Sequence, residues 1–176
     1  MKTQTTPRRR RVIALPEADV SPAASAITVR TARRGDLPAV IAIDTLVTGM
    51  SKQAYWHSLF VRYGKPGDRH RQFLVAVIDT LVVGFVIGEV RDWEFGSPPC
   101  GWVFAIDVSP DARLAGVGAQ LLHAICDGFR AAGIRKVRTM LARDNTLILS
   151  FFRSQGMTTG PFIPLELDLD EGPWPA

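Results

Sequence analysis

The chain has 176 residues, of which 47% are hydrophobic and 22% are charged, and its formal net charge is +4. These values are typical of one globular domain and exclude a fibrous or low-complexity protein. No apolar run approaches the roughly 20 residues of a membrane-spanning helix, and no secretory signal follows the basic N-terminus. Cys100 and Cys126 have neither disulfide-framework nor metal-site spacing, so we expect a cytoplasmic protein without a metal site.

The positive charge is concentrated at the N-terminus. Residues 1–26 carry five basic and two acidic side chains, including the run Arg8–Arg11. Such a run in a Pro-, Ala-, Ser- and Thr-rich segment is typical of a solvated arm, although it could also touch nucleic acid or an acidic partner. No aromatic residues are interleaved with it, which disfavours nucleic-acid binding. We predict a basic arm over 1–26, one domain over 27–170 and a tail over 171–176.

From residue 27 onward, the hydrophobic pattern alternates between the period of a strand and that of a helix. The predicted elements, in order, are a strand near 27–32, helices near 36–47 and 51–64, a hairpin over 73–90, a strand over 100–108, a helix over 117–133, a strand over 134–141, a helix over 146–156 and a last strand over 162–169. This order lacks the regular βαβ alternation of a doubly wound fold. The sequence therefore predicts a single α/β domain with a mixed sheet.

The stretch VSPDARLAGVGAQLL, residues 108–122, places two glycines between an apolar strand and an apolar helix. Each glycine in a helix lowers its stability by about 1 kcal/mol relative to alanine. Two glycines at a helix start therefore indicate that the backbone itself is needed there. A helix N-terminus offers unpaired N–H groups, and glycine lets a phosphate approach them closely. Arg113 adds a positive charge. The stretch indicates either a diphosphate site or a tight turn that needs glycine for its backbone angles alone.

Two nucleotide-binding motifs are excluded here, because no Gly-Lys-Ser/Thr is present and the spacing differs from the dinucleotide fingerprint. The pattern V-x-P-x-x-R-x-x-G-V-G-x-x-L over residues 108–121 instead resembles the acetyl-CoA signature of the GNAT N-acetyltransferases. The element order over 27–169 is similar to that family's domain, and Asn145 followed by FFRSQGM resembles its closing segment. The resemblance implies a mixed, mostly antiparallel sheet of about seven strands flanked by about four helices.

The resemblance also implies acetyl-CoA as the cofactor and coenzyme A as a product. In the family, pantetheine fills a gap beside the strand that precedes the motif, and amides of the motif hold the pyrophosphate. Carried over, the predicted cofactor-binding residues are Ile106, Val108, Arg113, Leu114, Ala115, Gly116, Val117, Gly118, Ala119, Asn145 and Phe152.

The implied reaction is direct attack of an amine on the acetyl thioester, but the two usual acid–base residues are missing. The family's tyrosine falls at Phe152, and the glutamate that some members use falls at Trp102. A bare thiolate at pH 7 costs only about 2 kcal/mol, so the missing acid would slow the reaction and not abolish it. Neutralising a lysine amine costs about 4.6 kcal/mol, against about 1.4 kcal/mol for an α-amine. A site without a carboxylate would therefore suit an α-amine or a water-relayed base.

Two nearby carboxylates are candidate catalytic groups. Asp107 lies in the strand over 100–108, where strict alternation puts it on the face opposite Trp102; its alternative role is structural hydrogen bonding. Glu94, in the loop DWEFG, could reach over an acceptor groove or could be a solvated loop charge. The candidate acceptor-binding residues are Tyr55, Trp56, His57, Trp93 and Trp102, with burial in the core as the alternative for the aromatic ones.

The sequence thus predicts an acetyl-CoA-dependent N-acetyltransferase for a primary amine, with a slight preference for a protein or peptide amine over a small molecule. The missing residues lend support to the alternative, an acetyl-CoA-binding sensor or partner protein with little or no turnover. No membrane partner is expected. The strand over 162–169 could pair between subunits as a homodimer, or be sealed within its own domain.

Overall fold

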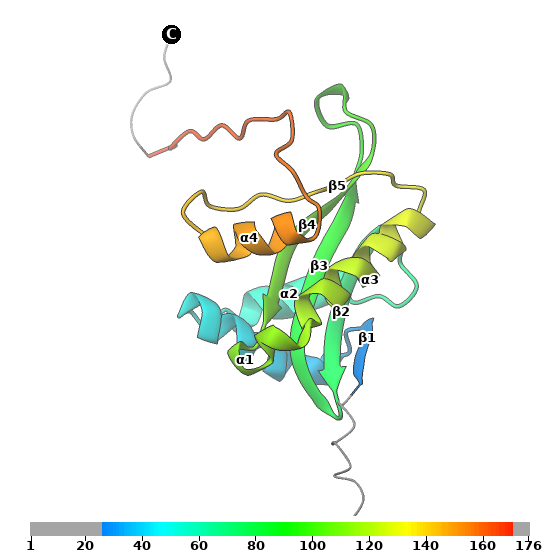
Figure 1. Cartoon of the computed structure of the whole chain (residues 1–176), viewed down its shortest axis with the longest axis vertical. Coiled ribbons are helices and arrows are strands. Elements are labelled where there is room, and N and C mark those ends of the chain that lie inside the picture. Colours follow the sequence, from blue (N-terminus) through cyan, green and yellow to red (C-terminus); the bar gives the residue numbers. More distant parts are fainter. Residues whose placement is uncertain (1–25, 171–176) are drawn as a thin grey trace, which may run out of the picture.

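The computed structural model describes residues 26–170, and it contains five strands and four α-helices (Figure 1). The elements are β1 (Ile27–Thr31), α1 (Leu37–Thr48), α2 (Gln53–Tyr63), β2 (Arg71–Ile78), β3 (Leu81–Arg91), β4 (Cys100–Val108), α3 (Val117–Ala131), β5 (Val137–Arg138) and α4 (Thr146–Ser154). The predicted arm, with Arg8–Arg11, and the predicted tail lie outside the described residues, apart from Ala26. No helix over residues 26–170 has the length and apolar character that crossing a membrane requires.

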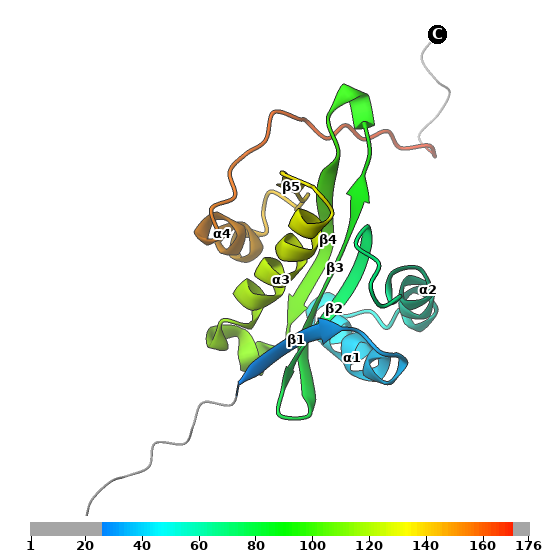
Figure 2. The same cartoon turned by 90° about the vertical axis from the view of Figure 1, so that its right-hand side faces the viewer.

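The strands form one sheet in the order β1-β2-β3-β4-β5, so the strands follow one another in space as they do in the chain. Neighbouring strands are antiparallel except β4 and β5, which are parallel. Figure 2 shows the sheet nearly edge-on, with α1 and α2 on one side and α3 and α4 on the other. These two sides are called the α1/α2 face and the α3/α4 face below.

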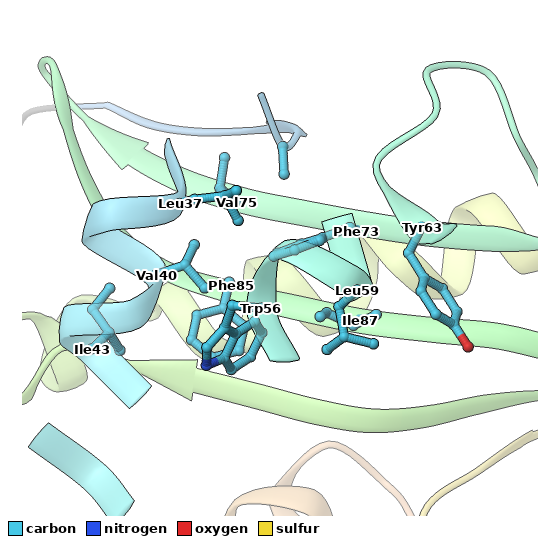
Figure 3. Packing of buried hydrophobic residues seen from close by; sticks show 11 residues of the cluster. Leu37, Val40, Ile43, Trp56, Leu59, Tyr63, Phe73, Val75, Phe85 and Ile87 are labelled. Atoms are coloured by element: carbon cyan, nitrogen blue, oxygen red, sulfur yellow. The ribbon is translucent and has the colours of Figure 1, made fainter. Parts of the chain in front are cut away.

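Each face has its own hydrophobic core, because β2 and β3 carry apolar residues on both sides. Over the α1/α2 face, Leu37 and Val40 of α1 and Trp56 of α2 pack on strand residues that include Phe73 and Phe85 (Figure 3). Over the α3/α4 face, α3 buries the stripe that its helical spacing predicts, namely Val117, Leu121, Ile125 and Phe129.

The prediction of about seven strands is wrong for the described residues, which contain five. The strand predicted over 134–141 is reduced to the two residues of β5. Residues 162–169 form no strand, and the side chains of Ile163, Leu165, Leu167 and Leu169 are 58–90% exposed. Alternation defines an apolar face, but a strand also needs a partner edge, and β5 is too short to provide one. The single α/β domain with a mixed sheet is confirmed.

Candidate functional site

The first feature of the site is an open edge of β4. This strand pairs along its whole length with β3, but it pairs with β5 only at Gly101 and Trp102. Within residues 26–170, Val103–Val108 therefore has no strand partner on its other side. Backbone groups of Ile106 and Val108 lie in this segment, where an extended ligand can add to the sheet as another strand does.

The second feature is the glycine turn that follows β4. A short 3-10 helix, Pro110–Ala115, leads to Gly116, whose φ of +77° is a left-handed conformation that favours glycine. A Cβ at Gly116 would meet nothing within 4 Å, so the turn also leaves open space in front of α3. The first turn of this 15-residue helix presents N–H groups to that space. The turn interpretation is therefore confirmed at Gly116, and the diphosphate site stays a prediction.

Around Gly118 the structure changes the assignment of one residue. A Cβ at Gly118 would lie 3.1 Å from Cε2 of Phe151, so the Phe151 ring lies against the start of α3. Phe152, the position of the family's usual tyrosine, is instead 4% exposed in the core of the α3/α4 face. The side chain of Asn145 accepts a hydrogen bond from the backbone N–H of Ile148 and caps α4. The residue that reaches Gly118 from α4 is therefore Phe151.

A β-bulge in β4 overturns the predicted orientation of Asp107. Ile87 of β3 pairs with Ala105, whereas the next residue pairs with Val103, so Phe104 is an extra residue. The bulge shifts the alternation by one position. Asp107 is opposite Phe85 and Trp102 is opposite Glu89, and these two β3 residues, four apart, share a face. Asp107 and Trp102 therefore both lie on the α1/α2 face, and the expectation of opposite faces is wrong.

Asp107 is half-buried in a charged environment. Its pKa is raised to about 6, mainly by burial and also by the carboxylate of Asp44, while Lys52 and Arg113 act in the opposite direction. Asp44 is buried and accepts hydrogen bonds from Lys52 Nζ at 3.0 Å and from the indole N–H of Trp56 at 2.8 Å. Asp107 therefore exchanges its proton close to neutral pH, the range in which acid–base groups in enzymes work.

A second carboxylate on this face, Glu89 of β3, was missed by the sequence analysis. It lies directly opposite Trp102, the position of the glutamate that some GNAT members use. The hydroxyl of Tyr63 donates to Glu89 Oε2 at 2.7 Å, and Nε of Arg91 donates to Oε1 at 3.2 Å. The Arg91 guanidinium also lies 4.2 Å from the centre of the Trp102 ring. The available signal was a lone carboxylate in the otherwise apolar run LVVGFVIGEV.

Trp56, predicted as an acceptor-binding residue, belongs to the core. It is 2% exposed and its ring lies edge-on to Phe85, 4.9 Å between centres, and near Phe73 at 6.1 Å. Its indole N–H is already bound by Asp44. The core alternative therefore holds for this residue, while its neighbours on α2, Tyr55 and His57, are exposed.

The hairpin between β3 and β4 carries the remaining candidates. Glu94 is exposed and forms an ion pair with Arg91 at 3.8 Å, so it joins the group around Trp102. Trp93 is 66% exposed and, like Phe95, has a positive φ, 49° and 48° respectively. The structure thus brings Glu94 and Trp102 together through Arg91, and it leaves Trp93 exposed at the hairpin tip.

A comparison with protein families gives the class of this arrangement. The model of the Acetyltransferase (GNAT) family matches residues 40–157, about two thirds of the chain. The chain belongs to this family. The matched residues include β4, the glycine turn and α3. Acetyl-CoA is the cofactor of GNAT acetyltransferases.

Two curated GNAT relatives and two solved structures are similar to the chain. L-2,4-diaminobutyric acid acetyltransferase from Nocardia farcinica is 29% identical over 58% of the chain and 51% of its own length. Mycothiol acetyltransferase from Saccharomonospora viridis is 26% identical over 70% of the chain and 47% of its own length. The chain thus spans about half the length of these curated relatives.

The solved structures show the same fold. An aminoglycoside N-acetyltransferase, AAC(6')-Iy in complex with CoA, has a TM-score of 0.73 and 18% identity, covering 85% of this chain and 99% of that one. Ard1 from Thermoplasma volcanium has a TM-score of 0.62 and 24% identity, covering 74% of this chain and 82% of that one. At these identities the likeness is one of fold alone.

Proposed function

We propose that this chain transfers the acetyl group of acetyl-CoA to a primary amine of a small, positively charged molecule. The observation that carries the proposal is the position of Glu89, whose carboxylate lies on the α1/α2 face directly opposite Trp102, the last residue of β4 before its open edge. A neighbouring strand thereby supplies a carboxylate at the level where β4 itself has a tryptophan.

The residues along the open edge and the glycine turn suit acetyl-CoA. Unpaired backbone groups of Ile106 and Val108 would hold its pantetheine arm, and the amides from Arg113 to Ala119 would hold its pyrophosphate. The exposed Arg113 side chain would pair with phosphate oxygens. When bound, acetyl-CoA supplies the acetyl group as a thioester and leaves as coenzyme A. Phe151 replaces Phe152 in this set, because Phe152 is buried.

Glu89 is proposed to accept the proton of the acceptor amine. The need is physical, because an amine that is protonated at pH 7 cannot attack until it loses a proton. A well-placed general base contributes about 10²- to 10⁴-fold to a rate. Glu89 has hydrogen-bonding capacity left, since an ionised carboxylate has about four lone-pair sites and Tyr63 and Arg91 use two.

The acceptor is proposed to be cationic because the α1/α2 face carries several acidic groups. The Asp107 carboxylate has neither a hydrogen bond nor an ion pair among the described residues, which leaves its charge available to a bound ammonium group. The names of the similar proteins support a small molecule, since one refers to diaminobutyric acid and another to aminoglycosides. A protein or peptide acceptor, preferred slightly from the sequence, is the competing outcome. A cytoplasmic location and a homodimer stay predictions.

The test is thiol release from acetyl-CoA in the presence of diamines, monoamines, aminoglycosides, peptides and proteins. We expect turnover with small polyamines, a kcat about 100-fold lower in Glu89→Gln, and unchanged acetyl-CoA binding in that variant. Gly118→Trp should lose acetyl-CoA binding, because an indole there would overlap the Phe151 ring and disturb the start of α3. Turnover with peptides alone would contradict the small-molecule acceptor. Tight acetyl-CoA binding without any turnover would favour the sensor alternative.

A further inference from the structure

Tyr63 touches both the candidate base and the bulge of β4. It is the last residue of α2 and is buried, and its hydroxyl donates to Glu89 Oε2 at 2.7 Å. Its ring packs edge-on against Phe104, the extra residue of the bulge, with 5.3 Å between ring centres. Figure 3 shows Tyr63 at the end of the core cluster farthest from Ile43. One side chain thus links α2, the carboxylate and the bulge.

The protonation state of Tyr63 makes it a permanent donor. Its pKa is raised to about 12, mainly by burial and also by the hydrogen bond to Glu89 and the negative charge of that carboxylate. Arg62 and Arg71 oppose this effect. The phenol therefore keeps its proton throughout the neutral range, and its hydrogen bond to Glu89 always runs from hydroxyl to carboxylate.

The two donors around Glu89 hold its two oxygens separately. Tyr63 holds Oε2, and Nε of Arg91 holds Oε1 at 3.2 Å. Arg91 is shared, because it also contacts Glu94 at 3.8 Å and lies over Trp102. Within residues 26–170 the Tyr63 hydroxyl makes no second hydrogen bond, and the side chain sits in the core, so it is the more rigid of the two donors. A glutamate has several rotatable bonds, and a fixed donor removes much of that freedom.

We infer that Tyr63 is a positioning residue that fixes the Glu89 carboxylate in the orientation needed to take a proton from the acceptor amine. This inference rests on the proposed role of Glu89. It assigns a function in the reaction to a buried aromatic residue that lies outside both the glycine motif and the open edge of β4.

A double-mutant cycle tests the inference in the full chain. Tyr63→Phe keeps the ring against Phe104 and removes the hydrogen bond. We expect kcat to fall about tenfold, with KM for acetyl-CoA unchanged, since one hydrogen bond to a charged group is lost. In the Glu89→Gln background the same change should have no further effect, because the base is already absent. An equal fall in both backgrounds would overturn the inference in favour of a structural role.

A spectroscopic titration gives a second readout that does not depend on turnover. The chain has only two tyrosines, so the absorbance of tyrosinate in Tyr63→Phe reports Tyr55 alone and can be subtracted. Tyr63 should ionise at lower pH in Glu89→Gln than in the wild type, and an unchanged titration would overturn the contact. Full activity of Glu89→Gln would overturn the base assignment and this inference together. A slow Glu89→Gln beside an unaffected Tyr63→Phe would overturn the positioning role alone.

Discussion

The two faces of the sheet are built on different principles. On the α3/α4 face the packing is apolar and depends on missing side chains: a Cβ at Gly101 would lie 2.4 Å from Phe129, and one at Gly88 would lie 2.9 Å from the same ring. On the α1/α2 face the same strands carry Glu89 and Asp107 among their apolar residues. Close apolar packing thus positions α3, the helix that begins at the glycine turn, whereas the proposed chemistry depends on where the charged groups lie.

The difference predicts two kinds of sensitivity. A change on the α3/α4 face should alter stability through volume, with little dependence on pH, because α3 buries mainly apolar side chains there. A change on the α1/α2 face should alter stability through desolvated charge, with a dependence on pH. Three substitutions separate these cases.

Gly101→Ala should have the largest effect on stability. The new Cβ would overlap the Phe129 ring, which is completely buried in the core of the α3/α4 face. Overpacking of this kind costs about 3 kcal/mol of unfolding free energy. Urea denaturation at two pH values is the measurement. The matched control is Gly35→Ala, where a Cβ would meet nothing within 4 Å, so a change within about 0.5 kcal/mol is expected. Equal losses in the two variants would contradict the volume argument.

Asp44→Ala should have the next largest effect, on the other face. The substitution leaves the buried indole N–H of Trp56 without its acceptor and removes the partner of Lys52. An unsatisfied buried donor costs about 2 kcal/mol, and the partly exposed Lys52 adds little, since water can solvate it. Urea denaturation checks the loss. Asp44→Asn keeps an oxygen that can accept from Trp56, so its loss should be the smaller; an equal loss would show that the ion pair, and not the indole hydrogen bond, matters.

The contrast between the faces also explains what the sequence could reveal. The glycine turn and the apolar stripe of α3 are local patterns, and both were predicted at Gly116, Gly118 and Val117–Phe129. The orientation of Asp107 was predicted wrongly, because a single extra residue at Phe104 shifts the alternation and cannot be recognised in the local sequence pattern. Glu89 was missed because the donor to its Oε2, Tyr63, comes from α2, and pairing across the fold is not a local property.

The prediction of a strand over residues 162–169 was wrong for a related reason. Residues 162–169 alternate as clearly as any strand in the chain, but alternation specifies which side of a strand is apolar and not which edge it joins. The parallel neighbour of β4 is only two residues long, so the sheet in the described residues ends before it offers an edge of matching length. Alternation of apolar residues thus predicts a strand well where a long neighbouring strand, such as β3, is available to pair with it.

Asp107→Asn should have the smallest effect and the opposite sign. The pKa of Asp107 is raised from its ordinary 3.8 to about 6, so the folded protein binds this proton more tightly than the unfolded chain does. Stability is therefore lost as pH rises from about 4 to about 6 and stays lower above that range. Asparagine avoids this loss, so the variant should gain about 1 kcal/mol at pH 7, a value reduced for solvent screening of a half-buried group.

The measurement for Asp107→Asn is the difference in Tm between variant and wild type across this pH range. The difference should grow from about pH 4 to about pH 6 and then level off, whereas the loss in Gly101→Ala should be the same throughout. The variant should also bind cationic amines less well, because the charge that makes Asp107 costly in the free protein is the one that a bound ammonium group would neutralise. A gain in stability without any pH dependence would mean that packing, and not the desolvated charge of Asp107, destabilises the wild type at this position. Stability on the α1/α2 face would then depend on volume, as it does on the α3/α4 face.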